Sequence, residues 1–163
     1  MSEKWISIVD FPRYEVSNFG GVLDTRYDRY LVKTLVQKAI PTVGLVKDRI
    51  LYRRSVPLLV ATHWLANDIG SPFDTPIHLD GDRSNCFVGN LLWRPRWFAI
   101  QYHREKLFEE AMPNVKVVCS KTGEVFESIR DASIYYGFME RDIIKSLRTD
   151  LPVWPDQVVF ELY

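Results

Sequence analysis

The segment 76–93 constrains the fold of this 163-residue chain more than any other part of its sequence. It runs from His78, at the end of a short β-forming stretch, through the turn-forming pair Asp80-Gly81 to Asn90, which precedes a second β-forming stretch. Aspartate, glycine and asparagine favour tight turns because they adopt backbone angles that other residues avoid. In 97–111, apolar residues then recur at the spacing of an inward helix face: Phe98, Tyr102 and Leu107. These patterns predict a ββα unit, two short strands joined by a turn-rich loop and followed by a helix.

Short β-forming stretches separated by turns fill the chain ahead of this unit. Residues 3–27 predict a hairpin with turns at Ser17-Asn18 and Gly20-Gly21, and residues 31–54 predict further strands with a basic outer face. Residues 56–67 predict a helix. The expected inward face of that helix is formed by Leu58, Leu59, Thr62 and Leu65. The N-terminal part of the chain is therefore expected to be rich in β-structure.

The C-terminal part predicts a small module of its own, with a boundary at 112–114. Its expected strands are 115–119, 125–126 and 158–163. Between them, Ser128 is placed to cap a helix over 129–136, and Gly137 is placed to end it. A second helix is expected at 139–147, and two short helices around a glycine turn form the helix-turn-helix pattern.

The charge of the chain is zero overall but unevenly distributed, with 21 basic and 21 acidic residues. Residues 29–54 hold seven lysines and arginines, including Arg53 and Arg54, against the single acid Asp48, whereas the last third is acidic. Because phosphate neutralisation supplies most non-specific affinity for DNA, the basic segment is the part suited to meet it. A solvated pair of strands carries the same charges, so charge alone leaves both interpretations open.

Other features indicate a protein of the cytoplasm that works without a membrane. Every apolar run is too short to span a bilayer, and the first residues have no apolar signal core. Cys86 and Cys119 form no Cys-x-x-Cys pair, so a zinc knuckle is not expected and both are expected to be reduced thiols.

The run from His78 to Asn85, followed by Asn90-Leu-Leu-Trp93, resembles the HNH motif of phage and intron homing endonucleases. The stretch from Trp5 to Gly21 is similar to the nuclease-associated modular domain that precedes this motif, and 117–147 resembles the helix-turn-helix repeat that follows it. The resemblance implies an α+β fold with a ββα-metal (His-Me finger) nuclease unit between a β-rich module and a strand plus helix-turn-helix module. The implied domains are 1–55, 56–112 and 113–163.

The resemblance also implies a chemistry, in which a DNA strand is nicked or cut. His78 takes the place of the general base, Asn90 that of the residue that pins the loop, and Asp80 that of the residue that shapes the turn. The cofactor is a divalent metal, Mg²⁺ or Mn²⁺, which stabilises charge on the phosphate. The expected DNA contacts are Arg53, Arg54, Arg83, Arg94, Arg96, Arg141 and Lys145.

Two departures concern the metal. The family's ligand positions before the histidine and on the following helix are occupied here by Ile77 and Ala99, whose side chains have no donor atom. His103, one helical turn after Ala99, is the remaining metal-ligand candidate. Cys86 replaces the second asparagine of the loop.

Three functions therefore stay open at the level of sequence. The first is an HNH endonuclease that acts on DNA through His78. The second is a DNA-binding protein that kept the scaffold without the chemistry, and the third is a phage factor that binds a host protein. The sequence does not give the oligomeric state, the DNA target or the strand preference.

Overall fold

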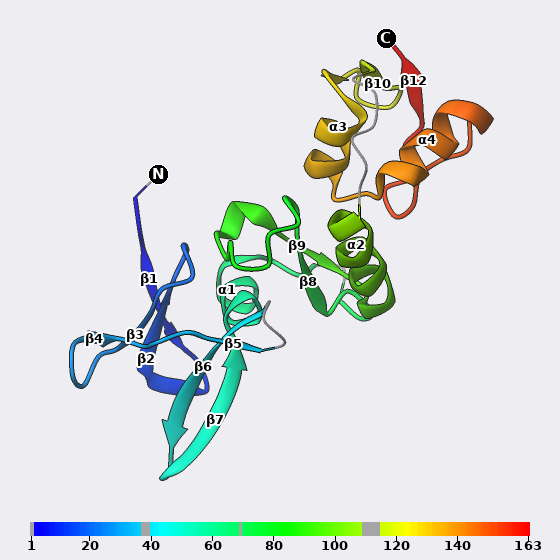
Figure 1. Ribbon diagram of the computed structural model, residues 1–163. Helices are drawn as coiled ribbons and strands as arrows, with labels where there is room; N and C mark the ends of the chain where they lie inside the picture. The colour runs from blue at the N-terminus through cyan, green and yellow to red at the C-terminus, as the bar shows by residue number, and fades with distance from the viewer. Residues whose placement is uncertain (1, 37–39, 69, 109–114) are drawn as a thin grey trace. The chain divides into compact units, whose positions relative to one another are not determined.

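The structure is a computed structural model that describes residues 2–36, 40–68, 70–108 and 115–163. It divides into two compact units, Met1–Ala99 and Ile100–Tyr163, each described here by itself. The described residues form helices and several small antiparallel sheets, which confirms the predicted α+β class (Figure 1). The expected boundary at 112–114 lies outside the described residues, and the division into three modules stays a prediction.

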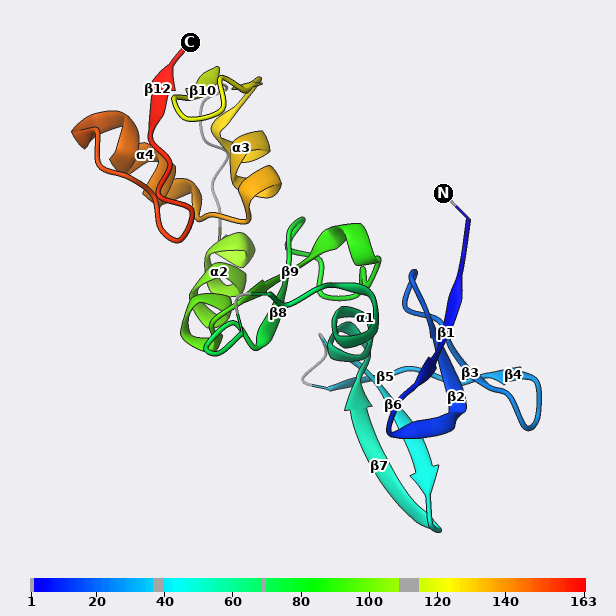
Figure 2. The same ribbon diagram turned by 180° about the vertical axis from the view of Figure 1, so that it is seen from behind.

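Two antiparallel sheets form the N-terminal part of the first unit. The first has the order β1-β2-β3-β4 and consists of β1 (Trp5–Ile8), β2 (Phe11–Ser17), β3 (Val22–Asp24) and β4 (Arg29–Tyr30). The second has the order β5-β6-β7 and consists of β5 (Thr34–Val36), β6 (Ile40–Lys47) and β7 (Ile50–Ser55). The strands β6 and β7 form a hairpin that projects from the unit in both ribbon views (Figures 1 and 2).

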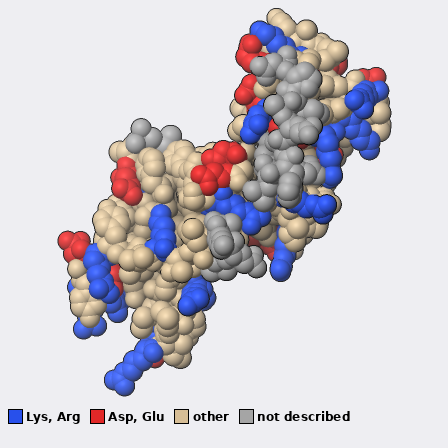
Figure 3. All heavy atoms as spheres, in the orientation of Figure 1, with Lys and Arg blue, Asp and Glu red and all other residues tan. Residues whose placement is uncertain are grey.

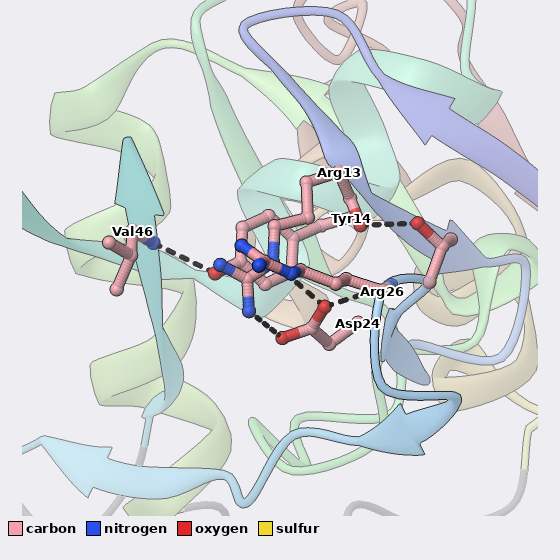
Figure 4. A network of polar contacts seen from close by, with 6 residues as sticks. Arg13, Tyr14, Asp24, Arg26 and Val46 are labelled. Carbon is pink, nitrogen blue, oxygen red and sulfur yellow. Dashed lines mark hydrogen bonds and ion pairs between the residues drawn. The ribbon is translucent and has the colours of Figure 1, made fainter. Parts of the chain in front are cut away.

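The two sheets are tied together around Arg13 and Tyr14. The Arg13 guanidinium donates two hydrogen bonds to the buried carboxylate of Asp24, which joins β2 to β3 (Figure 4). These bonds hold the pKa of Asp24 below its ordinary value. The Tyr14 hydroxyl accepts the backbone N–H of Val46 at 3.0 Å, which links β2 of the first sheet to β6 of the second.

The predicted ββα unit is present. Its parts are β8 (Thr75–His78), the short 3₁₀ helix η1 (Val88–Asn90), β9 (Leu91–Arg94) and α2 (Arg96–Phe108). The strands β8 and β9 pair antiparallel, with Ile77 opposite Leu92 and His78 opposite Leu91. Phe98 and Tyr102 are buried as expected, while the side chain of Leu107 lies outside the described residues.

The helix α1 (Val56–Trp64) packs against both N-terminal sheets and against β8 and β9. The expected inward face was partly wrong, because Leu58 is 41% exposed and Thr62 is exposed. The buried positions are Val56, Pro57, Leu59, Val60 and Ala61. Since sheets cover the helix on more than one side, a single stripe does not describe its buried surface.

One hydrophobic core serves the N-terminal sheets and the start of the ββα unit together. It includes Val16 and Val22 from the first sheet, Val43 from the second, Val60 from α1 and Leu91 from β9. The N-terminal sheets, α1 and the strand β9 therefore contribute to the same core. Within the described residues, no helix is both long and apolar enough to cross a membrane.

The second unit has its own core beneath a three-stranded sheet of order β11-β10-β12. Its elements are β10 (Val117–Cys119), β11 (Val125–Phe126), α3 (Ile129–Tyr136), α4 (Glu140–Thr149) and β12 (Phe160–Leu162). The predicted cap is confirmed, because the Ser128 side chain accepts the backbone N–H of Asp131 at 3.0 Å. Gly137 ends α3 at a φ of 63°, also as predicted.

Candidate active site

His78 is the last residue of β8 and is only 2% exposed. Its carbonyl accepts the N–H of Gly81 at 3.0 Å, which starts the turn into the loop 79–90. Gly81 has a φ of 81°, a left-handed conformation that glycine adopts without strain. The Asp80-Gly81 pair, predicted from the sequence to be a turn, therefore turns the chain directly after His78.

The side chain of Asn90 fastens the two ends of the 79–90 loop to each other. Its Oδ1 accepts the backbone N–H of Asp80 at 3.0 Å. Its Nδ2 donates to Asp80 Oδ1 and to the carbonyl of Asn85, both at 2.9 Å. The backbone carbonyl of Asn90 accepts the N–H of Leu79, also at 2.9 Å. The residue after His78 and the one following it are therefore both bonded to Asn90.

Asp80 and Asp82 organise the interior of the loop. Asp80 Oδ1 accepts the N–H of Asp82 at 2.9 Å, and Asp80 Oδ2 accepts the side-chain amide of Asn85 at 2.7 Å. Asp82 accepts both the N–H and the hydroxyl of Ser84, which lowers the pKa of Asp82. Asn85 was given no role from the sequence. Its place inside an aspartate-rich turn is the sequence signal by which its role could have been found.

Burial controls the protonation of His78. Removal of the ring from water lowers the pKa of His78 from its ordinary 6.5 to about 4, because the charged imidazolium loses hydration. Asp80 and Asp82 oppose this change, whereas Arg83 adds to it. The imidazole is therefore neutral at pH 7 and able to accept a proton.

The residues around His78 do not fit the divalent metal that an HNH centre implies. Ile77 is 0% exposed and Ala99 is 3% exposed, so both ligand positions are occupied by buried hydrocarbon. A hard cation needs oxygen or nitrogen ligands. Within the described residues, no three histidine, cysteine, aspartate or glutamate side chains come together to hold a metal. His103 is buried on the part of α2 that belongs to the second unit, and its metal role stays a prediction.

Cys86, which stands at the position of the second asparagine, is a packing residue. It is 2% exposed and belongs to the core of the first unit. Burial raises the pKa of its thiol to about 11, which keeps the sulfur protonated and weakly reactive.

The arginines expected to contact DNA in the first unit differ in exposure. Arg53 on β7 and Arg96 at the start of α2 are exposed, and Arg83 is half-buried in the 79–90 loop. The half-buried Arg54 lies over the rings of Phe11 and Tyr52. By contrast, Arg94 is 3% exposed with its guanidinium over Phe98, so packing is the role that the structure gives it and phosphate contact stays a prediction.

Basic side chains also gather on the β6–β7 hairpin and on α4. Lys47 and Arg49 are exposed at the tip of the hairpin, where Figure 3 shows basic groups. In the second unit Arg141 and Lys145 are exposed on α4, four residues apart and so on one helix face. Arg141 forms an ion pair with Asp142 at 3.7 Å. The expected DNA contacts therefore lie on both units.

Two comparisons identify proteins similar to this chain, while no family model matches it. The chain is 28% identical over 147 residues to a protein of Acanthamoeba polyphaga mimivirus described as an uncharacterized HNH endonuclease, L245. The match covers 88% of this chain but only 43% of the mimivirus protein, so the chain spans less than half the length of that relative.

A solved structure described as DNA binding and cleavage by the HNH homing endonuclease I-HmuI matches over 98% of both chains. Its TM-score is 0.56 and its sequence identity is 18%, which shows a shared fold. Both comparisons agree with the resemblance to HNH endonucleases that the sequence predicted. In sequence the chain is therefore similar to a protein described as an HNH endonuclease, and it shares the fold of an HNH homing endonuclease.

Proposed function

We propose that this chain binds DNA and acts as an HNH-type endonuclease that nicks or cuts it, with His78 as the general base. The observation that carries the proposal is the buried imidazole at the end of β8, next to a loop that Asn90 fastens on both sides. A relative described as an HNH endonuclease and a neighbour described as binding and cleaving DNA support the same function.

His78 has one chemical task in this proposal. The neutral imidazole takes a proton from a water molecule while the water oxygen forms a bond to phosphorus and the bond from phosphorus to one sugar oxygen breaks. A pKa of about 4 makes it a weak base in the free protein. A DNA phosphate brought beside the ring would raise that pKa, because a negative charge favours the imidazolium.

The proposed DNA-binding surface of the first unit is the β6–β7 hairpin. A two-stranded β-ribbon fits the major groove of B-DNA. The hairpin carries exposed Lys47, Arg49 and Arg53, with Asp48 as the acid of its turn. We further propose that Arg141 and Lys145 on α4 contact DNA in the manner of a helix-turn-helix module. We propose that the protein acts in the cytoplasm, on DNA that is present there.

A second candidate is DNA binding without cleavage. It is favoured by one observation, the buried hydrocarbon of Ile77 and Ala99 at the family's ligand positions. The two candidates share the same DNA-binding surface and differ only in whether a phosphodiester bond is broken.

A nicking assay separates these candidates. Supercoiled plasmid is incubated with wild-type protein in Mg²⁺ or in Mn²⁺, beside His78→Ala and the control His63→Gln. His63 is a suitable control because its ring bonds to Leu59 and Val9, away from the 79–90 loop. Nicking by the wild type and the control but not by His78→Ala supports the endonuclease. Binding of DNA without nicking in either metal supports the second candidate.

A salt titration tests the DNA surface itself. Fluorescence anisotropy with a labelled duplex gives the slope of log K against log salt for the wild type, for Arg53→Gln and for Lys145→Gln. Loss of one phosphate contact should reduce the slope by about 1. The absence of binding at low salt would reject both DNA-binding candidates and leave a protein partner.

A further inference from the structure

We infer that the turn between β2 and β3, residues 17–21, is a positioning element of the candidate active site, with Asn18 as its central positioning residue. The inference rests on the proposed function, since it assigns a task to a part of the chain outside the ββα unit. The turn contains the Ser17-Asn18 pair that the sequence marked only as a turn between two strands.

Asn18 is anchored to the residues that precede β1. Its Oδ1 accepts the N–H of Lys4 at 2.7 Å, and its own N–H donates to the carbonyl of Lys4 at 3.1 Å. Its Nδ2 donates to the carbonyl of Ser2 at 3.3 Å. Asn18 is 5% exposed. These bonds fix the Asn18 peptide although it lies in a turn.

The fixed peptide then holds the far end of the 79–90 loop. The carbonyl of Asn18 accepts the N–H of Val88 at 2.9 Å, at the first residue of η1. The last residue of η1 is Asn90, which bonds to Leu79 and Asp80 next to His78. Asn18 is therefore linked to the residues that follow His78 by its hydrogen bond to Val88, by the short backbone of η1, and by the hydrogen bonds of Asn90.

Packing of the two residues that follow Asn18 supports the same contact. The rings of Phe19 and Phe87 lie with their centroids 5.0 Å apart. Gly20 has a φ of 81°, and a Cβ on it would lie 2.7 Å from the Cβ of Cys86. The close approach leaves no room for a side chain at Gly20. The turn therefore fits against residues 86–88 by shape as well as by hydrogen bonding.

The inference is tested by the local opening of the 79–90 loop, which requires no enzymatic activity. Amide hydrogen exchange is measured by NMR for wild type, Asn18→Ala and Phe19→Ala. Phe19 is 41% exposed, so Phe19→Ala is the variant least harmful to folding. The control Asn67→Ala removes an asparagine that anchors another turn, through Phe73 and Gly70. Exchange at Leu79 and Asp80 should be about tenfold faster in Asn18→Ala, and unchanged in Asn67→Ala.

The titration of the His78 ring gives a second readout that mere loss of stability does not change. Asp80, Asp82 and Arg83 act on this ring, so loosening the loop alters its surroundings. Asn18→Ala should raise the His78 pKa by about 1, as the ring gains water, and Asn67→Ala should not. The chain has three histidines, so the signal is assignable by single substitution.

Unchanged exchange and unchanged His78 titration in a folded Asn18→Ala or Phe19→Ala protein would overturn the inference. Equal changes in Asn67→Ala would overturn it too, because the effect would then be general. If Asn18→Ala does not fold, Phe19→Ala decides the matter alone. If the wild type fails to nick DNA, the proposed cleavage is contradicted. The amide exchange and the His78 titration still test the positioning role of Asn18 in that case.

Discussion

Acidification from pH 7 to pH 4 should destabilise the first unit through His78, and the size of the effect follows from its burial. The pKa of the ring is about 4 in the folded protein and about 6.5 in the unfolded chain, where the ring is hydrated. Below pH 6.5 the unfolded chain therefore binds a proton that the folded protein does not bind. Stability is lost as the pH falls from 6.5 towards 4, and this contribution levels off below pH 4.

The size of this loss of stability follows from the folded and unfolded pKa values of His78. The free energy of unfolding should fall by about 2 kcal/mol at pH 5 and by about 3 kcal/mol at pH 4, relative to a protein without this group. The reference protein is His78→Gln, whose amide does not titrate. The difference between wild type and His78→Gln also cancels the contribution of Asp24, which is present in both proteins.

Urea unfolding followed by tryptophan fluorescence measures this difference. Four of the five tryptophans, Trp5, Trp64, Trp93 and Trp97, lie in the first unit, so the signal reports mainly on it. The wild type should lose stability relative to His78→Gln between pH 6.5 and pH 4. A difference that stays constant from pH 7 to pH 4 would refute the reasoning, because the ring would then be equally hydrated in both states.

Three further predictions test the loop, the second unit and the thiol. Asn90→Ala should lower the free energy of unfolding, measured in urea, by about 3 kcal/mol, because three side-chain hydrogen bonds are lost at a buried position. The control Asn85→Ala changes an exposed residue and should lower it by about 1 kcal/mol. Equal losses in the two variants would contradict this prediction. Ser128→Ala should destabilise the second unit by about 1 kcal/mol in thermal unfolding followed by circular dichroism, because the N–H of Asp131 loses its cap, and an unchanged midpoint would argue against the cap. Cys86 should stay unmodified by iodoacetamide at pH 8 and react in urea, as mass spectrometry can show, and rapid labelling of the native protein would disprove its burial.

The ββα unit and the cap of α3 were predictable because their signals are local. His78, Asp80-Gly81 and Asn90 lie within thirteen positions of one another, and turn propensities act over a few residues. Ser128 likewise caps a helix whose first turn lies beside it in sequence. Helix α1 was predicted to extend to residue 67 but ends at Trp64, because the backbone of Leu65 is extended.

Long-range packing decided what the sequence left open. The burial of Leu59 rather than Leu58 depends on which sheets pack against α1. The burial of Arg94 depends on Phe98 of α2, whose ring lies against its guanidinium. No local pattern contains that information, because the partners are distant along the chain.

The sequence by itself therefore determined the kind of centre this protein has: a histidine before an Asp-Gly turn, an asparagine that pins the loop, and hydrocarbon at Ile77 and Ala99. The tertiary structure alone decided the state of that centre. Burial makes His78 a neutral, weak base, and Asn18, sixty residues away, holds the loop beside it. The loss of water from the ring and the hydrogen bonds between distant residues arise only once the chain has folded, which is why neither could be read from the order of the residues.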